Sequence, residues 1–231
     1  MDAGGTGTRR NAAIAGLALI AFAGCSTTSV RSDEPAPTTH GIFDGKSLRG
    51  WVQRGGAAVY RVEDGVIIGE TRPNQPNTFL CTEKEYSDFI LELEFKVDPA
   101  LNSGVQVRSH ARPQGELERV FGYQVEIDPS DRAWTAGIYD EARRGWLVNP
   151  SEQARGAFRQ RDWNSLRVEA RGTQLRTWLN GVPAALLVDG MDASGFIALQ
   201  VHGVGPRTEP LTIMWRSLKL TELNPGPVAG P

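Results

Sequence analysis

The chain has 231 residues, and its 25 basic and 27 acidic side chains leave a formal charge of −2 at pH 7. That length suits one domain plus a leader, and the near-neutral balance excludes an electrostatic basis for binding nucleic acid or an acidic membrane surface. The 26 Gly, 14 Pro and 6 Trp residues are typical of a β-protein with many turns rather than of a helical protein.

The N-terminus has the pattern of a secretory leader. A pair of arginines precedes the apolar run 12–23, which is shorter than the roughly 20 residues that span a bilayer. The run leads into FAGC, which resembles the lipobox of bacterial lipoproteins and predicts lipidation of Cys25; an ordinary secretory signal with a chance cysteine is the alternative. We therefore expect a signal peptide over 1–24 and a flexible polar tether over 25–39. The lipid would anchor the protein in the bacterial cell envelope, facing the periplasm or at the outer membrane.

Strand-like runs fill the segment 40–223, which we expect to be the single folded domain, and the Pro/Gly-rich tail 224–231 is expected to be disordered. The dipeptides Asp64-Gly65 and Asn180-Gly181 each separate two such runs and favour tight hairpin turns. Because the runs are short and alternate in polarity, and no long helical period appears, we predict an all-β jelly-roll sandwich of two antiparallel sheets.

Three of these runs carry an unusual set of polar residues on one face. The residues are Gln106 and Arg108 in SGVQVRSH, Gln124, Glu126 and Asp128 in GYQVEID, and Gln200 and His202 in GFIALQVHG. Lys and Thr, the usual residues of a solvated strand face, are missing from these faces, whereas FILELEFKV has an ordinary solvated face. Each strand alone is equally consistent with solvated surface. The three together favour one polar site on a concave sheet face.

Several motifs resemble those of the 3-keto-disaccharide hydrolase domain family. They are GIFDGKSLRGW, NSGVQVRS, GYQVEIDPSDRAWTAGIYDEARRG and the LQVHG segment, and the resemblance covers 41–223 in the same order. Many members have GYEVQI where this chain has GYQVEI, so the acid and the amide are exchanged here. The resemblance implies a concanavalin A-like jelly roll and an enzyme, a hydrolase or lyase that cleaves glycosides already oxidised to a ketone at C3. It also implies a glycoside substrate and a separate sugar 3-oxidoreductase that makes the ketone.

Such a cleavage needs a base for the proton at C2, a cation for the enolate and an acid for the leaving group. We assign Glu126 as the base, Arg108 as the cation and His202 as the acid. Glu126 and Asp128 are expected to form paired carboxylates, so that the pKa of one is raised by the other. A divalent cation, Ca²⁺ or Mn²⁺, held by Glu126, Asp128 and His202 is left open, since no tight ligand spacing supports it.

The remaining candidates would bind sugar hydroxyls or stack on sugar rings. They are Gln106, Gln124, Asp128, Tyr139, Asp140, Gln200 and Trp134. A loop cap is an equally consistent role for Asp140, and core packing is equally consistent for Trp134 and Trp146. Arg143 and Arg144 are expected to be structural or solvated.

Three other functions remain open. A non-catalytic, lectin-like carbohydrate-binding module on the same fold needs the polar face but no base. A β-glucanase of the laminarinase type carries E-x-D-x-E, whereas this chain has the run 126–130, EIDPS, and lacks the second glutamate. A purely structural envelope lipoprotein needs no site, and the three polar strand faces argue against it.

Overall fold

Fifteen strands and one short helix make up the described part of the chain, which comprises Met1 and residues 37–223 of a computed structural model. In chain order the elements are β1 (Thr38–Gly41), β2 (Trp51–Gly55), β3 (Val59–Glu63), β4 (Val66–Glu70), β5 (Thr78–Tyr86), β6 (Phe89–Val97), β7 (Ser103–Gln114), β8 (Leu117–Ile127), β9 (Ile138–Glu141), β10 (Gly145–Val148), α1 (Glu152–Ala157), β11 (Asn164–Arg171), β12 (Gln174–Leu179), β13 (Val182–Val188), β14 (Gly195–Val201) and β15 (Thr212–Glu222). The expected leader 1–24, Cys25 and the tail 224–231 lie outside the described residues. Within 37–223, no helix is long and apolar enough to cross a membrane.

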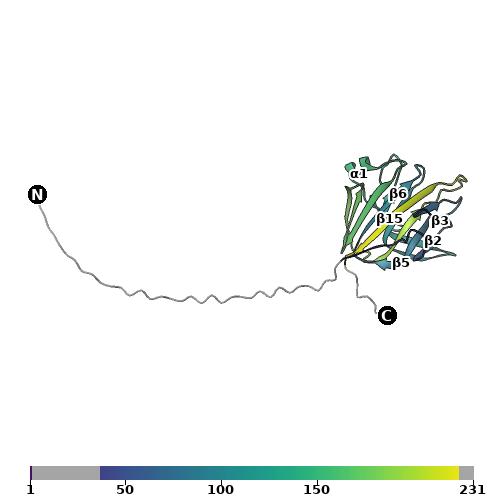
Figure 1. The fold of residues 1–231 in the computed structure, drawn as a ribbon, viewed down its shortest axis with the longest axis horizontal. Helices are drawn as coiled ribbons and strands as arrows, with labels where there is room; N and C mark the ends of the chain where they lie inside the picture. The colour runs from purple at the N-terminus through teal and green to yellow at the C-terminus, as the bar shows by residue number, and fades with distance from the viewer. Residues whose placement is uncertain (2–36, 224–231) are drawn as a thin grey trace, which may run out of the picture. The chain divides into compact units, whose positions relative to one another are not determined.

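The strands form two antiparallel sheets. The eight-stranded sheet has the order β13-β12-β11-β6-β15-β4-β3, with β1 paired to β15, and the seven-stranded sheet has the order β10-β9-β8-β7-β14-β5-β2. Figure 1 shows β6 and β15 side by side in the eight-stranded sheet. The predicted all-β sandwich of two antiparallel sheets is therefore confirmed. Strand β1 starts at Thr38 and pairs with β15, so the sheet includes two residues of the segment predicted as tether.

Period-two alternation builds the core between the sheets. In β6, Phe89, Leu91, Leu93 and Phe95 are buried in the core, while the residues between them point outward. The expected hairpin turns are also present, at Asp64-Gly65 between β3 and β4 and at Asn180-Gly181 between β12 and β13. All four turn residues have positive φ angles, which is the geometry of the tight turns that suit the strand twist.

The far end of the β7–β8 hairpin folds back over the outer face of the seven-stranded sheet. A second, smaller apolar cluster shows this, since Val120 of β8 packs there with Phe79 and Cys81 of β5. Arg54 of β2 also reaches Glu118 of β8 at 2.6 Å, although β2 and β8 are not neighbours in the sheet. The bend follows from a bulge between Val107 and His110. The folded-back hairpin forms one side of a hollow on this face.

Candidate active site

A polar pocket of about 460 Å³ opens on the outer face of the seven-stranded sheet. Its volume lies within the usual range for small-ligand sites, about 300–1,000 Å³. The residues that line it are Asn77, Asn102, Arg119, Gln124, Glu126, Arg132, Tyr139, Glu141, Trp146, Gln200 and His202. Five predicted site residues are among them: Gln124, Glu126, Tyr139, Gln200 and His202. The polar faces of β8 and β14 thus meet at one site, with β7 between them.

Glycine at position 104 leaves room for the pocket floor. Gly104 of β7 lies directly between Glu126 of β8 and Gln200 of β14 in the strand register. A Cβ atom at this position would lie 2.5 Å from the side chain of Gln124, which crosses the space above the glycine. The Gln124 side chain therefore takes the place of a side chain at position 104 and forms the pocket floor between Glu126 and Gln200.

Glu126 is the most deeply placed carboxylate of the pocket. Its side chain is buried, with 4% of the residue exposed, and it accepts hydrogen bonds from Asn102 Nδ2 at 2.6 Å and Gln124 Nε2 at 2.9 Å. Burial raises the pKa of Glu126, and the two amide donors lower it by less, so the net direction is upward. A raised pKa makes the ionised carboxylate a stronger base than an ordinary glutamate.

A line of hydrogen bonds fixes the orientation of the amide that contacts Glu126. Ser109 Oγ donates to Gln106 Oε1 at 2.6 Å, and Gln106 Nε2 donates to Gln124 Oε1 at 2.7 Å. With its oxygen engaged in this way, Gln124 must turn its NH2 group toward Glu126. Gln106, predicted to bind substrate, is fully buried beneath the pocket and instead orients Gln124.

Arg132 is a cation of the pocket that was not expected from the sequence. Its Nη2 lies 3.8 Å from Glu126 Oε1, and its Nε donates to Asp128 Oδ2 at 2.7 Å. The guanidinium also lies over the rings of Trp134 and Trp146, at 4.7 and 4.9 Å from their centroids. A carboxylate on one side and two indoles on the other hold the charge beside Glu126.

Asp128 lies just beyond the end of β8, and its charge contributes to the raised pKa of Glu126, as expected for paired carboxylates, but its hydrogen-bond partners are Ser130 and Arg132. Burial alone would raise the pKa of Asp128, but hydrogen bonds from Ser130 and Arg132 outweigh burial and lower it. Asp128 does not line the pocket. Its contact with Arg132 makes it a group that positions the cation rather than one that binds substrate.

Aromatic rings form one wall of the pocket. Tyr139 and Trp146 line it and meet edge to face, with ring centroids 5.2 Å apart. Trp134, predicted to stack on a sugar ring, is not a lining residue and packs edge to face behind Trp146 at 4.5 Å. The exposed aromatic surface therefore comes from Tyr139 and Trp146.

A second carboxylate, Glu141, lies elsewhere in the pocket. Burial raises its pKa, and it accepts from Arg119 Nη2 at 3.3 Å and from Asn77 Nδ2 at 3.4 Å. Glu141 could have been found from the sequence, since it shares a strand face with Tyr139 two residues earlier.

His202 also lines the pocket, and its Nδ1 lies 2.8 Å from the carbonyl oxygen of Gly203. Because a carbonyl only accepts, Nδ1 carries the hydrogen and Nε2 is left for a ligand.

Arg108 is not in the pocket, which corrects the expectation that it shares a face with Gln106. The residue has a positive φ of 47° in the β7 bulge, and this reverses the alternation after Val107. Its side chain is 1% exposed and donates to the carbonyls of Ser87 and Gly172 and to Asp88 Oδ1 at 2.8 Å. Arg108 therefore ties loops together and has no access to a ligand in the pocket.

Asp140 also lies away from the pocket, because it faces the opposite side of β9 from Tyr139. It is fully buried and accepts from Arg143 Nε at 2.7 Å and from Arg144 Nε. Arg143 also donates to Asp192 and Arg144 to Asp189, and both carboxylates lie in the loop before β14. This network is structural, as expected for the two arginines, and it corrects the expectation that Asp140 binds sugar hydroxyls.

The donor set left open for a divalent cation is not assembled. Within the described residues, no group of three or more His, Cys, Asp or Glu side chains is placed to hold a metal ion. Of the three residues considered, Asp128 is engaged by Arg132, and Glu126 by two amides.

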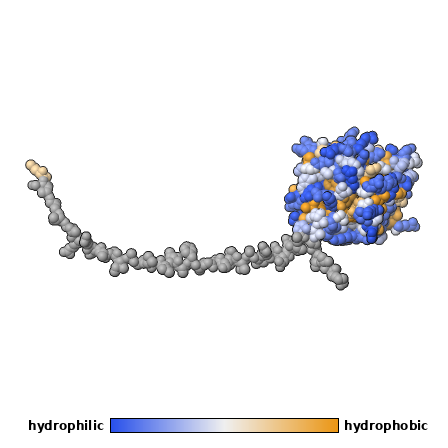
Figure 2. Space-filling view, viewed as in Figure 1, coloured by the Kyte–Doolittle hydropathy of each residue, from blue (hydrophilic) through white to orange (hydrophobic). Residues whose placement is uncertain are grey.

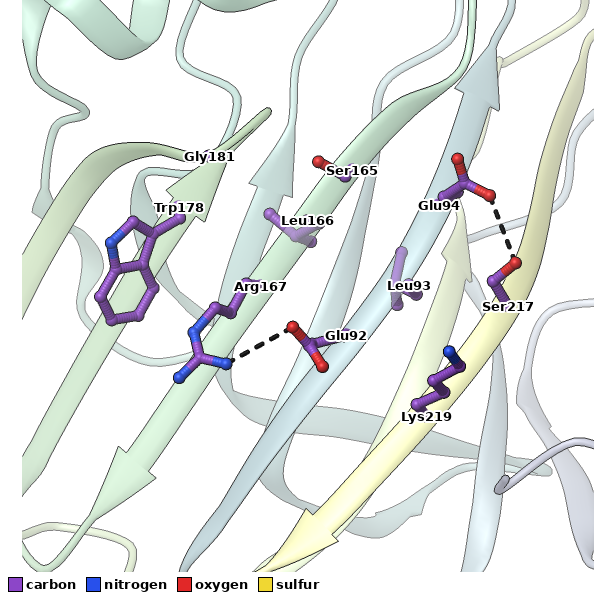
Figure 3. A pocket seen from close by; sticks show the side chains of 10 residues that line it. All are labelled: Glu92, Leu93, Glu94, Ser165, Leu166, Arg167, Trp178, Gly181, Ser217 and Lys219. Carbon is purple, nitrogen blue, oxygen red and sulfur yellow. Dashed lines mark hydrogen bonds and ion pairs between the residues drawn. The ribbon is translucent and has the colours of Figure 1, made fainter. Parts of the chain in front are cut away.

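A second hollow of about 400 Å³ lies on the outer face of the eight-stranded sheet (Figure 3). Its polar side chains pair across the strands, as Arg167 does with Glu92 at 3.5 Å and Ser217 with Glu94 at 3.2 Å. Hydrophilic residues cover much of the domain surface in Figure 2, which has the same view as Figure 1. The glutamates of this hollow belong to the solvated face expected for β6, and they are not buried as Glu126 and Glu141 are. We therefore take the pocket on the seven-stranded sheet as the candidate site.

Comparison with known proteins agrees with the fold and identifies the family to which the chain is matched. Residues 39–221 match the family of the 3-keto-alpha-glucoside-1,2-lyase-like domain. A candidate glycosyl hydrolase from Parabacteroides distasonis ATCC 8503 is 18% identical, with a TM-score of 0.56 over 80% of this chain and 94% of its own. No curated protein matches this chain.

Two further structures share the fold at lower identity. A protein of unknown function with a galectin-like fold from Bacillus subtilis has a TM-score of 0.61 and 10% identity, over 82% of this chain and 97% of its own. The carbohydrate-binding module CBM66 from Bacillus subtilis has a TM-score of 0.50 and 14% identity, over 74% of this chain and 94% of its own. Identities this low show the fold alone, a sandwich of the galectin and concanavalin A type.

Proposed function

This chain belongs to the 3-keto-alpha-glucoside-1,2-lyase-like domain family, and from that membership we propose that its pocket cleaves glycosides oxidised to a ketone at C3. The observation that carries the proposal is Glu126, a buried carboxyl group with a raised pKa at the floor of a pocket large enough for a sugar. A raised pKa makes the ionised carboxylate a stronger base and brings its titration closer to the working pH.

The reaction is an elimination in which the ketone activates the neighbouring carbon. Ionised Glu126 takes the proton from C2, and the C–H electron pair forms an enolate with C3 and its oxygen. The ketone then re-forms, the electrons make a double bond between C1 and C2, and the bond from C1 to the aglycone oxygen breaks. One proton goes to that oxygen. Addition of water, with OH to C1 and H to C2, gives net hydrolysis; without this addition the enzyme is a lyase.

His202 is the group that we assign to protonate the aglycone oxygen. Its Nδ1 hydrogen is directed to the Gly203 carbonyl, so the acid is the imidazolium form, which donates from Nε2. Glu126 lies on β8 and His202 directly follows β14, and both line the same pocket, which allows an acid and a base to act on one substrate. Positioned acid–base groups of this kind contribute about 10²–10⁴-fold each.

The aromatic wall suits the apolar face of a sugar ring or an aglycone. Tyr139 and Trp146 present partly exposed rings at the edge of an otherwise polar pocket. Sugars have both hydroxyl groups and apolar C–H faces, and this combination of polar floor and aromatic wall fits both.

A comparison of two substrates tests the proposal. A chromogenic glucoside and its 3-keto counterpart would be incubated with the protein and with its Glu126→Gln variant, each with and without EDTA. We expect aglycone release from the keto form only, and loss of at least 10²-fold in the variant. Sensitivity to EDTA would show a metal requirement.

The other outcomes separate the alternatives. Release from the unoxidised glucoside would show a conventional glycosidase. Binding of the keto form without release would leave the lectin-like module, and in that case Glu126→Gln would keep the binding.

The cellular setting that we propose is the bacterial cell envelope, with the domain held by lipid at Cys25. A second enzyme, a sugar 3-oxidoreductase, must supply the ketone, because nothing in the elimination oxidises C3. The proposal for the location rests on the leader pattern 1–24.

A further inference from the structure

Gln200 is a buried amide without a hydrogen-bond partner among the residues that the structure describes. The residue is 0% exposed, it lines the pocket, and neither its Nε2 nor its Oε1 is bonded to any described group. Gln106 and Gln124, the other two glutamines of this face, are both bonded through the line that ends at Glu126. Burying an unpaired amide is unfavourable, so an unpaired amide in the lining of a pocket points to a ligand that completes it.

The register places this amide opposite the proposed base. Glu126, Gly104 and Gln200 lie in one row across β8, β7 and β14. Two strand spacings separate the outer residues, about 10 Å between their Cα atoms. The Gln124 side chain lies over Gly104, and a sugar ring bound above this side chain would lie between the Glu126 carboxylate and the Gln200 amide.

We propose that Gln200 recognises the oxidised carbon, an inference that rests on the proposed function. Its Nε2 donates to the C3 ketone oxygen, and its Oε1 accepts from the C4 hydroxyl. An amide has a donor and an acceptor side by side, and a ketone beside a hydroxyl presents the complementary pair. When Glu126 removes the C2 proton, negative charge develops on the ketone oxygen, so the bond from Nε2 strengthens in the transition state. Gln200 thereby performs the enolate stabilisation that the sequence analysis assigned to Arg108.

The two arginines of the pocket are less suited to this role. Arg132 is fixed beside Glu126 by Asp128 and the two indoles, on the side of the base itself. Arg119 is directed to Glu141 at 3.3 Å. Gln200 is the pocket amide whose donor and acceptor are both left for a ligand.

A substrate analogue that cannot be cleaved separates this inference from the rest of the mechanism. In a 3-keto C-glycoside, C1 carries carbon in place of the aglycone oxygen, so only enolate formation is measured. NMR in D2O would follow exchange of the C2 proton with the protein and with Gln200→Glu, Gln200→Leu and Gln200→Asn. The exposed Gln174→Glu is the matched control.

We expect exchange to fall by about 10²–10³-fold in Gln200→Glu, which keeps the acceptor but loses the donor, and in Gln200→Leu, which loses both. Gln200→Asn should be intermediate, and Gln174→Glu should match the parent. Thermal unfolding identifies any variant that fails to fold, and the exchange rates of the folded variants then test the role of Gln200. Exchange at the parent rate in folded Gln200→Glu or Gln200→Leu would overturn the role of Gln200 alone. Absence of exchange in the parent protein would overturn the proposed function, and this inference with it.

Discussion

Gln124 Nε2 donates to Glu126 Oε2 at 2.9 Å, and both residues project from the same face of β8. The donor is neutral and its direction is fixed from behind by Gln106, so it orients the carboxylate without adding charge. A neutral donor lowers the pKa of a carboxyl group less than a close cation does. The Glu126 carboxylate is therefore held in one orientation, and its pKa is still raised.

Replacing Gln124 by glutamate should move the pH dependence of the reaction. Two carboxylates at this distance cannot both ionise easily, so the pKa of Glu126 rises further. The base acts only when ionised. The acid limb of kcat/KM should therefore shift to higher pH in Gln124→Glu, measured on the 3-keto glucoside between pH 4 and 9. Gln174→Glu is the control, and an unshifted acid limb in Gln124→Glu would show that Glu126 is not the base.

Gly104→Ala should damage the pocket, although alanine can adopt the backbone conformation at this position. The new Cβ would lie 2.5 Å from Gln124 Cδ, so that side chain must move and its bond to Glu126 is disturbed. We expect kcat/KM to fall by about 10²-fold, because small misplacements have effects of this size. A stability loss of about 1–3 kcal/mol should accompany it.

The matched control for this substitution is Gly156→Ala in α1. No atom lies within 4 Å of a Cβ at that position, and alanine favours a helix. Urea unfolding and steady-state rates measured on both variants would separate pocket damage from a general effect of an added methyl group. Equal activity of the two variants would contradict the role of Gly104.

Arg108→Met tests whether Arg108 is structural. Its removal leaves two carbonyls and the Asp88 carboxylate without the guanidinium that they share, so the free energy of unfolding should fall by about 3 kcal/mol. Below the unfolding temperature, kcat/KM should stay within about 3-fold of the parent. Arg176→Met, at an exposed position, should change stability by no more than about 0.5 kcal/mol. A large loss of activity at unchanged stability would instead return Arg108 to the reaction.

The two-residue period of strands explains what could be predicted from the sequence. It determines which side chains share a face, and therefore it brought Gln124 and Glu126 to one surface and Phe89 and Leu91 to the core. The fold class follows from the same pattern with the hairpin dipeptides. What the pattern requires is an unbroken strand.

The errors fall where the strand is interrupted. The bulge in β7 redirects Arg108, and Asp128 lies beyond the last residue of β8. Other pocket residues depend on tertiary structure that no local pattern shows. Arg119 comes from the folded-back hairpin and Arg132 from the turn between β8 and β9, so neither belongs to an alternating face that points at the pocket.

Lipidation should depend on Cys25 alone. Metabolic labelling with radioactive palmitate in a bacterial host should label the full chain, and Cys25→Ser should lose the label and leave the membrane fraction. Cys81→Ser is the control, because Cys81 is buried in the small apolar cluster and cannot be reached by a lipid-transferring enzyme. Retention of the label in Cys25→Ser would contradict the lipoprotein prediction.

Asp128→Asn should destabilise the protein in a pH-dependent way. Hydrogen bonds from Ser130 and Arg132 outweigh burial and lower the pKa of Asp128 in the folded state. A lowered folded pKa stabilises the protein above the unfolded pKa, about 3.9 for Asp, and this stability is lost as pH falls through the folded value. At pH 7 we expect a loss of about 1 kcal/mol in the variant, a modest figure because Arg132 is partly exposed to solvent.

Urea unfolding at pH 7 and pH 3 would measure this difference. The gap between the parent protein and Asp128→Asn should narrow at pH 3, while the exposed neighbour Asp131→Asn should show little effect at either pH. Activity should fall as well, because Arg132 loses the carboxylate that holds it beside Glu126. An equal gap at both pH values would mean that Asp128 stabilises the loop through neutral hydrogen bonds and not through its charge.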